Sequence, residues 1–243
     1  MYSLLKKEIN SFLSSILGYV VIVTFLLVVS LFLWVFPGDF NVLDNGYSSL
    51  DGLFMIAPWV YLFLIPAITM RSFAEEKKSG TIELLLTRPL SDLQIVLAKY
   101  FAGIVLVIFS IIPTLIYYFA IYRLGSPTGN IDIGATNGSY IGIIFLASSF
   151  VAIGLFASSI TDNQVISFII SIFLCFIAYQ GFDSFSNLQL FSGIDNIIAD
   201  LGISQHYLSM SRGVIETRDV IYFIGVSAIF ILMTRTSLES RKW

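Results

Sequence analysis

Charged residues are scarce in this sequence. Asp, Glu, Lys and Arg together make up 12% of the 243 residues, about half of their share in an ordinary soluble domain. Hydrophobic residues make up 57%, and the mean hydropathy is +0.89. A soluble chain of this length could bury a large core, but it could not cover its surface with so few charges. The composition excludes an ordinary soluble protein and predicts a chain embedded in a bilayer.

Cysteine and histidine each occur only once. Cys175 lies inside an apolar run, which excludes a disulfide framework and a Cys/His metal cluster. His206 falls beside Tyr207 in a segment expected to be external, where solvation is a better interpretation than metal binding or catalysis. The net charge of −3, with no basic stripe, excludes a nucleic-acid partner. We expect no catalytic residue, metal or bound cofactor in this chain.

The sequence also lacks the residues that three classes of membrane protein would need. The phosphate-binding pattern G-x-x-x-x-G-K-[ST] is absent, so ATP hydrolysis would belong to another chain. The interiors of the expected membrane spans contain no acid, base or histidine, which disfavours a secondary transporter or channel, the main alternative. An intramembrane enzyme would need paired catalytic groups at membrane depth, and none is available. We therefore expect a transport subunit that is not itself an enzyme.

Six apolar runs are long enough, or nearly so, to cross about 30 Å of hydrocarbon. They must be helical, because an isolated strand would leave its backbone groups unpaired in lipid. Prolines inside two of these runs predict kinks, at Pro58, Pro66 and Pro113. Gly154 and Ser158 form a small-xxx-small pair, for which helix packing is the preferred interpretation and a transport pathway the alternative. The expected spans are 17–36, 53–70, 100–122, 140–160, 165–182 and 220–234.

The basic residues indicate how the chain is oriented. With the N-terminus in the cytoplasm, the internal segments hold ten of the 13 Lys and Arg residues. The external segments hold only Arg123, Arg212 and Arg218. Because cytoplasmic loops are enriched in basic residues, this bias predicts that both termini are cytoplasmic.

Two connecting segments show helical spacing of apolar residues. In residues 1–16, apolar residues recur every three to four positions with polar residues between them. This spacing predicts an amphipathic helix on the inner membrane surface. In the external segment 183–219, the same spacing predicts a helix that dips into or lies along the outer interface. Its apolar positions are Leu190, Ile194, Ile197, Ile198 and Leu201.

The cytoplasmic loop 71–99 contains a short helix between two stop signals. A charged turn ends at Gly80, and a helix over 81–87 is then stopped by Pro89. Ser91 and Gln94 form a capping box that starts the helix of the third span. The short helix places Ile82, Leu85 and Leu86 on one side. These exposed apolar residues indicate either a docking surface for another protein or a segment that rests on the bilayer.

The same loop carries a family resemblance. Glu76-Lys-Lys-Ser-Gly80, followed by Thr-Ile-Glu-Leu-Leu-Leu-Thr-Arg-Pro, closely resembles the first cytoplasmic loop of ABC-2 type permeases, the membrane subunits of ATP-binding-cassette exporters. Residues 7–19 resemble the entry helix of that family, although the proline often present there is missing. Residues 154–164 resemble the end of its fourth span, and residues 211–219 a closing motif of one branch. The whole layout is similar to the gliding-motility-associated permeases.

This resemblance implies an all-α half-transporter that forms one membrane domain over residues 1–243. Residues 1–16 would be the connecting helix, and 81–87 the coupling helix that meets a cassette ATPase carrying ATP and Mg²⁺. Segment 183–219 would be an external re-entrant gate containing the five apolar residues named above. The implied coupling contacts are Glu76, as a charge at the rim, and Gly80, Thr81, Ile82, Leu85 and Leu86.

The resemblance also implies partners and a location. Two membrane subunits are needed for a pathway, either two copies of this chain or one copy and a relative. The gliding branch adds a further membrane subunit with an external domain. The implied role is gliding motility or envelope secretion, in the inner membrane of a bacterium and in contact with lipid.

Overall fold

The computed structural model describes residues 1–86, 90–187 and 195–240, with side chains described at all of these except 84–86, 187 and 196. Within these ranges every regular element is a helix, and the chain contains no strand. Six helices in this part of the chain are long and apolar enough to cross a membrane. The expected all-α architecture with six spans is confirmed.

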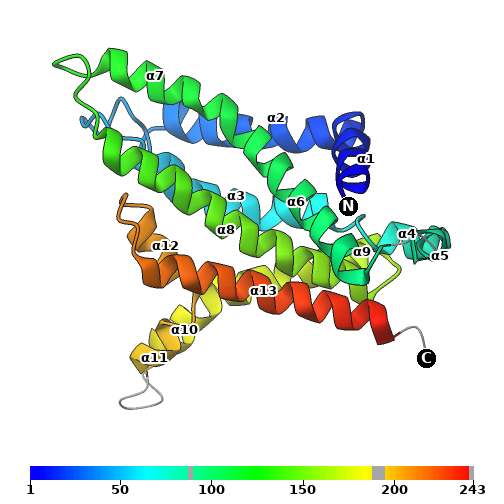
Figure 1. Cartoon of the computed structure of the whole chain (residues 1–243). Coiled ribbons are helices and arrows are strands. Elements are labelled where there is room, and N and C mark those ends of the chain that lie inside the picture. The colour runs from blue at the N-terminus through cyan, green and yellow to red at the C-terminus, as the bar shows by residue number, and fades with distance from the viewer. Residues whose placement is uncertain (87–89, 188–194, 241–243) are drawn as a thin grey trace.

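Each span is built from one or more helical elements (Figure 1). The first is α2 (Ile16–Ser30) with a π-helical turn, η1 (Leu31–Val35), and the second is α3 (Asp51–Thr69), extended by α4 (Ala74–Lys78). The third is α6 (Asp92–Ile111), η2 (Ile112–Thr114) and α7 (Leu115–Leu124), and the fourth is α8 (Ile133–Ile160). The fifth is α9 (Gln164–Phe176), η3 (Ile177–Gly181) and α10 (Phe182–Asn187), and the sixth is α13 (Thr217–Glu239).

Four short helices lie outside the spans. They are α1 (Tyr2–Leu13), α5 (Thr81–Leu86), α11 (Asp195–Ala199) and α12 (Ile203–Met210). Both chain termini and the pair α4–α5 lie at one end of the bundle, called here the N/C end, and α12 lies at the opposite end (Figure 1). In α1 the side chains of Lys6, Lys7 and Asn10 are exposed and Leu4 is buried, so the helix is amphipathic as its spacing predicts.

The fourth span forms the centre of the bundle. Of its most apolar 18-residue window, 78% is buried, against 28% for the first and fifth spans and 17% for the sixth. Small residues allow this crowding: a Cβ atom at Gly103 would lie 2.7 Å from Val151, and one at Gly154 would collide with Thr69. The packing role expected for Gly154 is therefore confirmed. The first, fifth and sixth spans leave wide apolar faces free for lipid or for another chain.

The prolines act differently along the spans. Pro113 lies in the 3₁₀ turn η2, which separates α6 from α7, so the expected distortion is present there. Helix α3 continues through both Pro58 and Pro66. A proline has no N–H for the carbonyl four residues earlier, so Pro58 leaves the Phe54 carbonyl without a helical donor. Tyr207 supplies that donor from α12, with an O–O distance of 2.6 Å.

Candidate functional site

Two short helices project from the N/C end: α4, which extends the second span, and α5, which precedes the third. Helix α4 ends at Lys78, the chain reverses at Gly80 with a φ of +72°, and α5 begins at Thr81. Because L-residues rarely adopt this φ, glycine suits the junction. The charged turn expected before Gly80 is in fact the helix α4.

The expected coupling residues lie in or beside α5. Ile82 is half-buried and packs on the core, and the Thr81 hydroxyl bonds to that of Ser79 at 2.8 Å. Leu85 and Leu86 belong to α5, but their side chains are outside the described part, as are residues 87–89 with the expected stop at Pro89. The capping box formed by Ser91 and Gln94 at the start of α6 is confirmed.

The Glu76 carboxylate turns inward. Its Oε1 lies 2.9 Å from Nζ of Lys99, and the side chain is 14% exposed. This corrects the expectation that Glu76 stands as a charge at the rim of the ATPase contact. The physical reason is Lys99, which is 2% exposed and needs nearby opposite charge to remain buried as a cation.

Lys99 joins three elements at the N/C end. On α6 it lies 3.2 Å from Oε1 of Glu8 on α1, in addition to its bond with Glu76 on α4. Its Nζ also lies 5.1 Å from the ring centroid of Phe73, as in a cation–π contact. Sequence reasoning missed this cluster, because Lys99 lies one residue outside the third span as it was expected. A lysine directly before an apolar run, with glutamates in two neighbouring segments, was the available signal.

Helix α4 is also fixed to the central helix α8. The Ser158 hydroxyl accepts hydrogen bonds from the backbone N–H groups of Phe73 and Ala74, at 2.9 and 3.0 Å. It donates to the Met70 carbonyl at 3.1 Å. Lys77 Nζ donates to the Ser159 carbonyl. The start of α4, whose N–H groups have no intrahelical partner, is thus capped by a side chain from another span.

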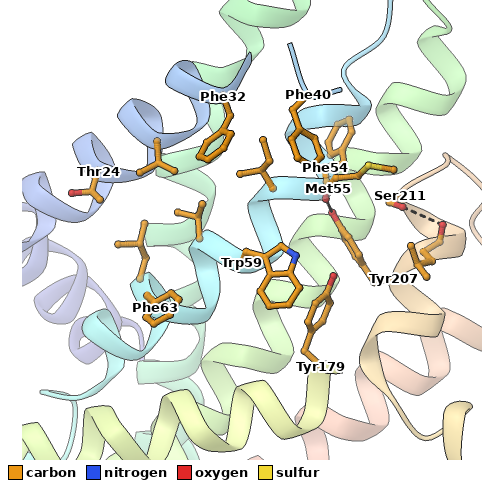
Figure 2. Close-up of a pocket in the computed structure, with 15 residues that line it drawn as sticks. Thr24, Phe32, Phe40, Phe54, Met55, Trp59, Phe63, Tyr179, Tyr207 and Ser211 are labelled. Carbon is orange, nitrogen blue, oxygen red and sulfur yellow. Dashed lines mark hydrogen bonds between the residues drawn. The ribbon is translucent and has the colours of Figure 1, made fainter. Parts of the chain in front are cut away.

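A second feature is a large apolar hollow on the side of the bundle, of about 760 Å³. Its walls come from α2, α3, η3 and α12, with aromatic side chains gathered around it (Figure 2). Trp59 and Tyr179 meet edge to face at 5.6 Å between ring centroids. Met55, Trp59 and Phe63 line the hollow while remaining 46–54% exposed, so it is open to the outside of the bundle. This volume lies within the range of small-molecule sites, roughly 300–1,000 Å³.

Tyr207 forms part of the wall and ties α12 to α3. The residue is 1% exposed, and burial raises the pKa of its hydroxyl well above the usual value. The hydroxyl therefore remains protonated and can donate to the Phe54 carbonyl. This hydrogen bond holds α12 against the side of the hollow.

The external segment differs from the single helix expected over 183–219. Two short helices, α10 and α11, are followed by α12, which packs back on the bundle. Leu190 and Ile194 lie outside the described residues. Ile197 and Leu201 are 61% and 55% exposed, Ile198 is half-buried, and none of the three lines the apolar hollow. The part of this segment that borders the hollow is α12, and the gating role stays a prediction.

The expectation that His206 is solvated is wrong. The residue is 6% exposed, and its Nδ1 lies 2.7 Å from Oδ1 of Asp219, at the start of α13. Nε2 lies 2.9 Å from the Asp200 carbonyl, and the ring stacks on Tyr222 with centroids 3.9 Å apart. Asp219 is 13 residues away along the chain, so local sequence gave no sign of this partner. The pair joins α12 to α13 at the end opposite the termini.

Comparison with known proteins assigns the chain to a family. No curated protein matches it. The family model described as ABC-2 family transporter protein matches residues 46–239. This stretch is well over half of the chain, and it contains α3 to α13, with the α4–α5 pair and the external helices. The protein is thus a multi-pass membrane protein, and the chain belongs to the ABC-2 transporter family.

Proposed function

We propose that this chain is the membrane-spanning permease subunit of an ATP-driven exporter, whose ATP and Mg²⁺ are bound by a separate cassette ATPase. The observation that carries the proposal is the attachment of α4, and through it α5, to three other helices of an ABC-2 family chain. An ATPase can move a membrane bundle only through a stiff contact. Ser158 fixes α4 to α8, and Lys99 fixes it to α6 and α1.

The proposed contact between α5 and the ATPase also sets the orientation of the chain in the membrane. The ATPase is cytoplasmic, so the N/C end faces the cytoplasm and both termini lie there. This agrees with the excess of basic residues expected on that side. The resemblance to gliding-motility-associated permeases supports the inner membrane of a bacterium as its location.

A second membrane subunit completes the pathway. The apolar hollow opens sideways between α2 and α3, and large apolar side chains at its mouth are exposed. A second copy of this chain or a related permease packs on this face, and the cargo passes between the two. The gate residues Leu190, Ile194, Ile197, Ile198 and Leu201 belong to the segment that precedes α12, which borders this face.

The resemblance to gliding-motility-associated permeases supports a finer role. In that role the exporter secretes or assembles envelope or motility components. A further membrane subunit with an external domain joins the complex. The polar helices α10–α12, at the end opposite the termini, are the surface for it.

A secondary transporter or channel is the competing function. Two buried charged residues, Lys99 and Asp219, lie in spanning helices, each one residue outside the span expected from the sequence, because the helices begin earlier than expected. Each lies near the end of its helix and is paired with residues at the same end of the bundle, namely Glu8 and Glu76 for Lys99 and His206 for Asp219. They therefore do not form an ion path across the membrane.

Purification from the native membrane tests the proposal. A cassette ATPase and a second permease chain should be recovered with this protein, and the complex should hydrolyse ATP. The isolated chain should have no ATPase activity. Robust hydrolysis by the isolated chain, after contaminating ATPases are removed, would contradict the assignment.

A further inference from the structure

A second, smaller hollow lies at the N/C end, with a volume of about 300 Å³. It is formed where α1, the start of α2, the turn between α3 and α4, and α6 come together. One part of its wall is apolar, from Phe12, Leu17 and Ile68. The rest is polar and carries charges of both signs. The hollow therefore suits a molecule that is both charged and partly apolar.

The charges around this hollow do not all have partners. Lys99 is bonded to Glu8 and Glu76, and Lys7 lies 3.7 Å from Glu8. Among the described residues, neither the Arg71 guanidinium nor the Glu75 carboxylate has a hydrogen-bond or ion-pair partner. One cation and one anion in the wall are therefore free to bind a ligand that carries both charges.

Glu76 adds a buried acceptor to the same wall. Its Oε1 accepts from Lys99, but its Oε2 is buried and has no partner in the described part of the chain. A buried carboxylate oxygen without a donor costs free energy, and an N–H donor from a ligand removes that cost. A primary ammonium supplies such donors, whereas a quaternary ammonium has no N–H group.

The apolar wall indicates where the ligand comes from. Ile68 belongs to a small core cluster with Val21 and Leu106, on which Phe12 and Leu17 pack. The amphipathic helix α1 and the first residues of the first span lie beside it, at the level where a bilayer changes from headgroups to acyl chains. A phospholipid places its phosphate, its headgroup amine and the start of its acyl chains at this level.

We propose that this hollow binds phosphatidylethanolamine from the leaflet at the N/C end. Arg71 pairs with the phosphate, and the ammonium donates hydrogen bonds to Glu75 and to Oε2 of Glu76. The glycerol and the first acyl carbons lie along Phe12, Leu17 and Ile68. The lipid then touches α1, the start of α2 and the α3–α4 segment at once, beside the Lys99 cluster. This inference does not depend on the ATPase partner.

The test is lipid binding to the full-length chain, purified in detergent and freed of lipid. Native mass spectrometry counts the bound lipid, and thermal unfolding measures the stabilisation it provides. The probes are phosphatidylethanolamine, phosphatidylcholine, phosphatidylglycerol and soluble phosphoethanolamine. We expect phosphatidylethanolamine to bind about tenfold more tightly than phosphatidylcholine, since only its headgroup donates charge-assisted hydrogen bonds.

Two variants and two matched controls locate the site. Arg71→Gln and Glu75→Gln should each weaken phosphatidylethanolamine binding about tenfold. Lys78→Gln and Glu83→Gln make the same changes of charge at exposed positions of the same loop that do not line the hollow, and should leave binding unchanged. If a variant fails to fold, the comparison of lipids on the unmodified chain decides the question.

Three results would overturn the proposal. Equal binding of phosphatidylcholine would show that the ammonium is not recognised. Equal binding of phosphatidylglycerol would show that the site recognises only the phosphate, through Arg71. Soluble phosphoethanolamine that binds as tightly as the lipid would show that the headgroup chemistry is right but that the ligand is not a membrane lipid.

Discussion

The hydroxyl of Tyr207 donates to the carbonyl of Phe54 across 153 positions of the sequence, at 2.6 Å. The acceptor is the carbonyl that Pro58 deprives of its helical N–H partner. The proline of one helix and the tyrosine of another are therefore a matched pair. Neither residue alone accounts for how α12 is held against α3.

Removing this hydroxyl should destabilise the protein. Tyr207→Phe leaves a buried carbonyl unsatisfied, and we expect a loss of about 1–3 kcal/mol in the free energy of unfolding. Thermal or denaturant unfolding in detergent measures it, with Tyr2→Phe, at a residue 78% exposed, as the control.

A second substitution tests the cause of that loss. Pro58→Ala restores a donor to the Phe54 carbonyl, so Tyr207→Phe should cost less in a Pro58→Ala background. Equal costs in both backgrounds would show that the tyrosine does not act through the proline.

Breaking the Lys99 cluster should have a large effect on stability and on coupling. Lys99→Met leaves the Glu8 and Glu76 carboxylates without their shared cation, and loss of one partner from a buried ion pair costs about 3–5 kcal/mol. ATPase association should persist while transport falls, because the link between α4, α6 and α1 is lost. Adding Glu8→Gln and Glu76→Gln should recover part of the stability.

The control for this variant is an exposed pair. Arg235 and Glu239 lie 2.8 Å apart with side chains 44% and 41% exposed. Arg235→Met should cost only about 0–1 kcal/mol. If Lys99→Met is no more harmful than this control in unfolding and transport measurements, Lys99 is not a joint between helices.

The apolar face of α5 should hold the ATPase. Burying a leucine at an interface contributes about 1.5–3 kcal/mol, so Leu85→Ser/Leu86→Ser should weaken association roughly a hundredfold or more. Co-purification and a binding titration measure this. Leu43→Ser/Leu124→Ser should bind the ATPase normally, because these leucines, 64% and 61% exposed, lie in the 36–50 loop and at the end of α7, at the other end of the bundle.

Glu76→Gln should behave unlike the leucine variant. Its carboxylate faces Lys99 and not an exposed surface, so association with the ATPase should be retained and transport reduced. If the double leucine variant binds its ATPase at full strength and supports transport, the coupling surface lies elsewhere.

The placement of the termini can be tested by chemical labelling. In a Cys175→Ala background, single cysteines at Asn45 and Asn130 should react with a membrane-impermeant thiol reagent from outside the cell. Cysteines at Ser79 and Ser240, exposed at the N/C end, should react only after the membrane is opened. External labelling of Ser79→Cys would invert the proposed orientation.

Local features of the fold were predictable because their causes are local. The six spans follow from run length, since only about 20 apolar residues cross the hydrocarbon. The capping box of Ser91 and Gln94 joins residues three positions apart, and Gly80 marks a backbone reversal that other residues rarely adopt. Each of these features depends on residues that are close to one another in the sequence.

The pairings that build the site were not predictable in this way. Lys99 and Glu8 are 91 positions apart, and Ser158 and Phe73 are 85 apart. Lys99 falls one residue outside the expected third span, yet it is buried with counter-charges from two other helices. Its place in an external segment favours solvation of His206, but Asp219 supplies a buried partner. Long-range pairing decides where a polar group in such a chain is placed.

The joint at Ser158 has no spare bonding capacity. A hydroxyl has one proton and two lone pairs, and here the proton goes to Met70 while the lone pairs serve Phe73 and Ala74. A tilt of α4 relative to α8 would therefore strain all three hydrogen bonds at once. A push on α5 either moves α8 as well or breaks three hydrogen bonds together. The contact between α4 and α8 is therefore stiff, and a displacement of α5 is passed on to the central helix of the bundle.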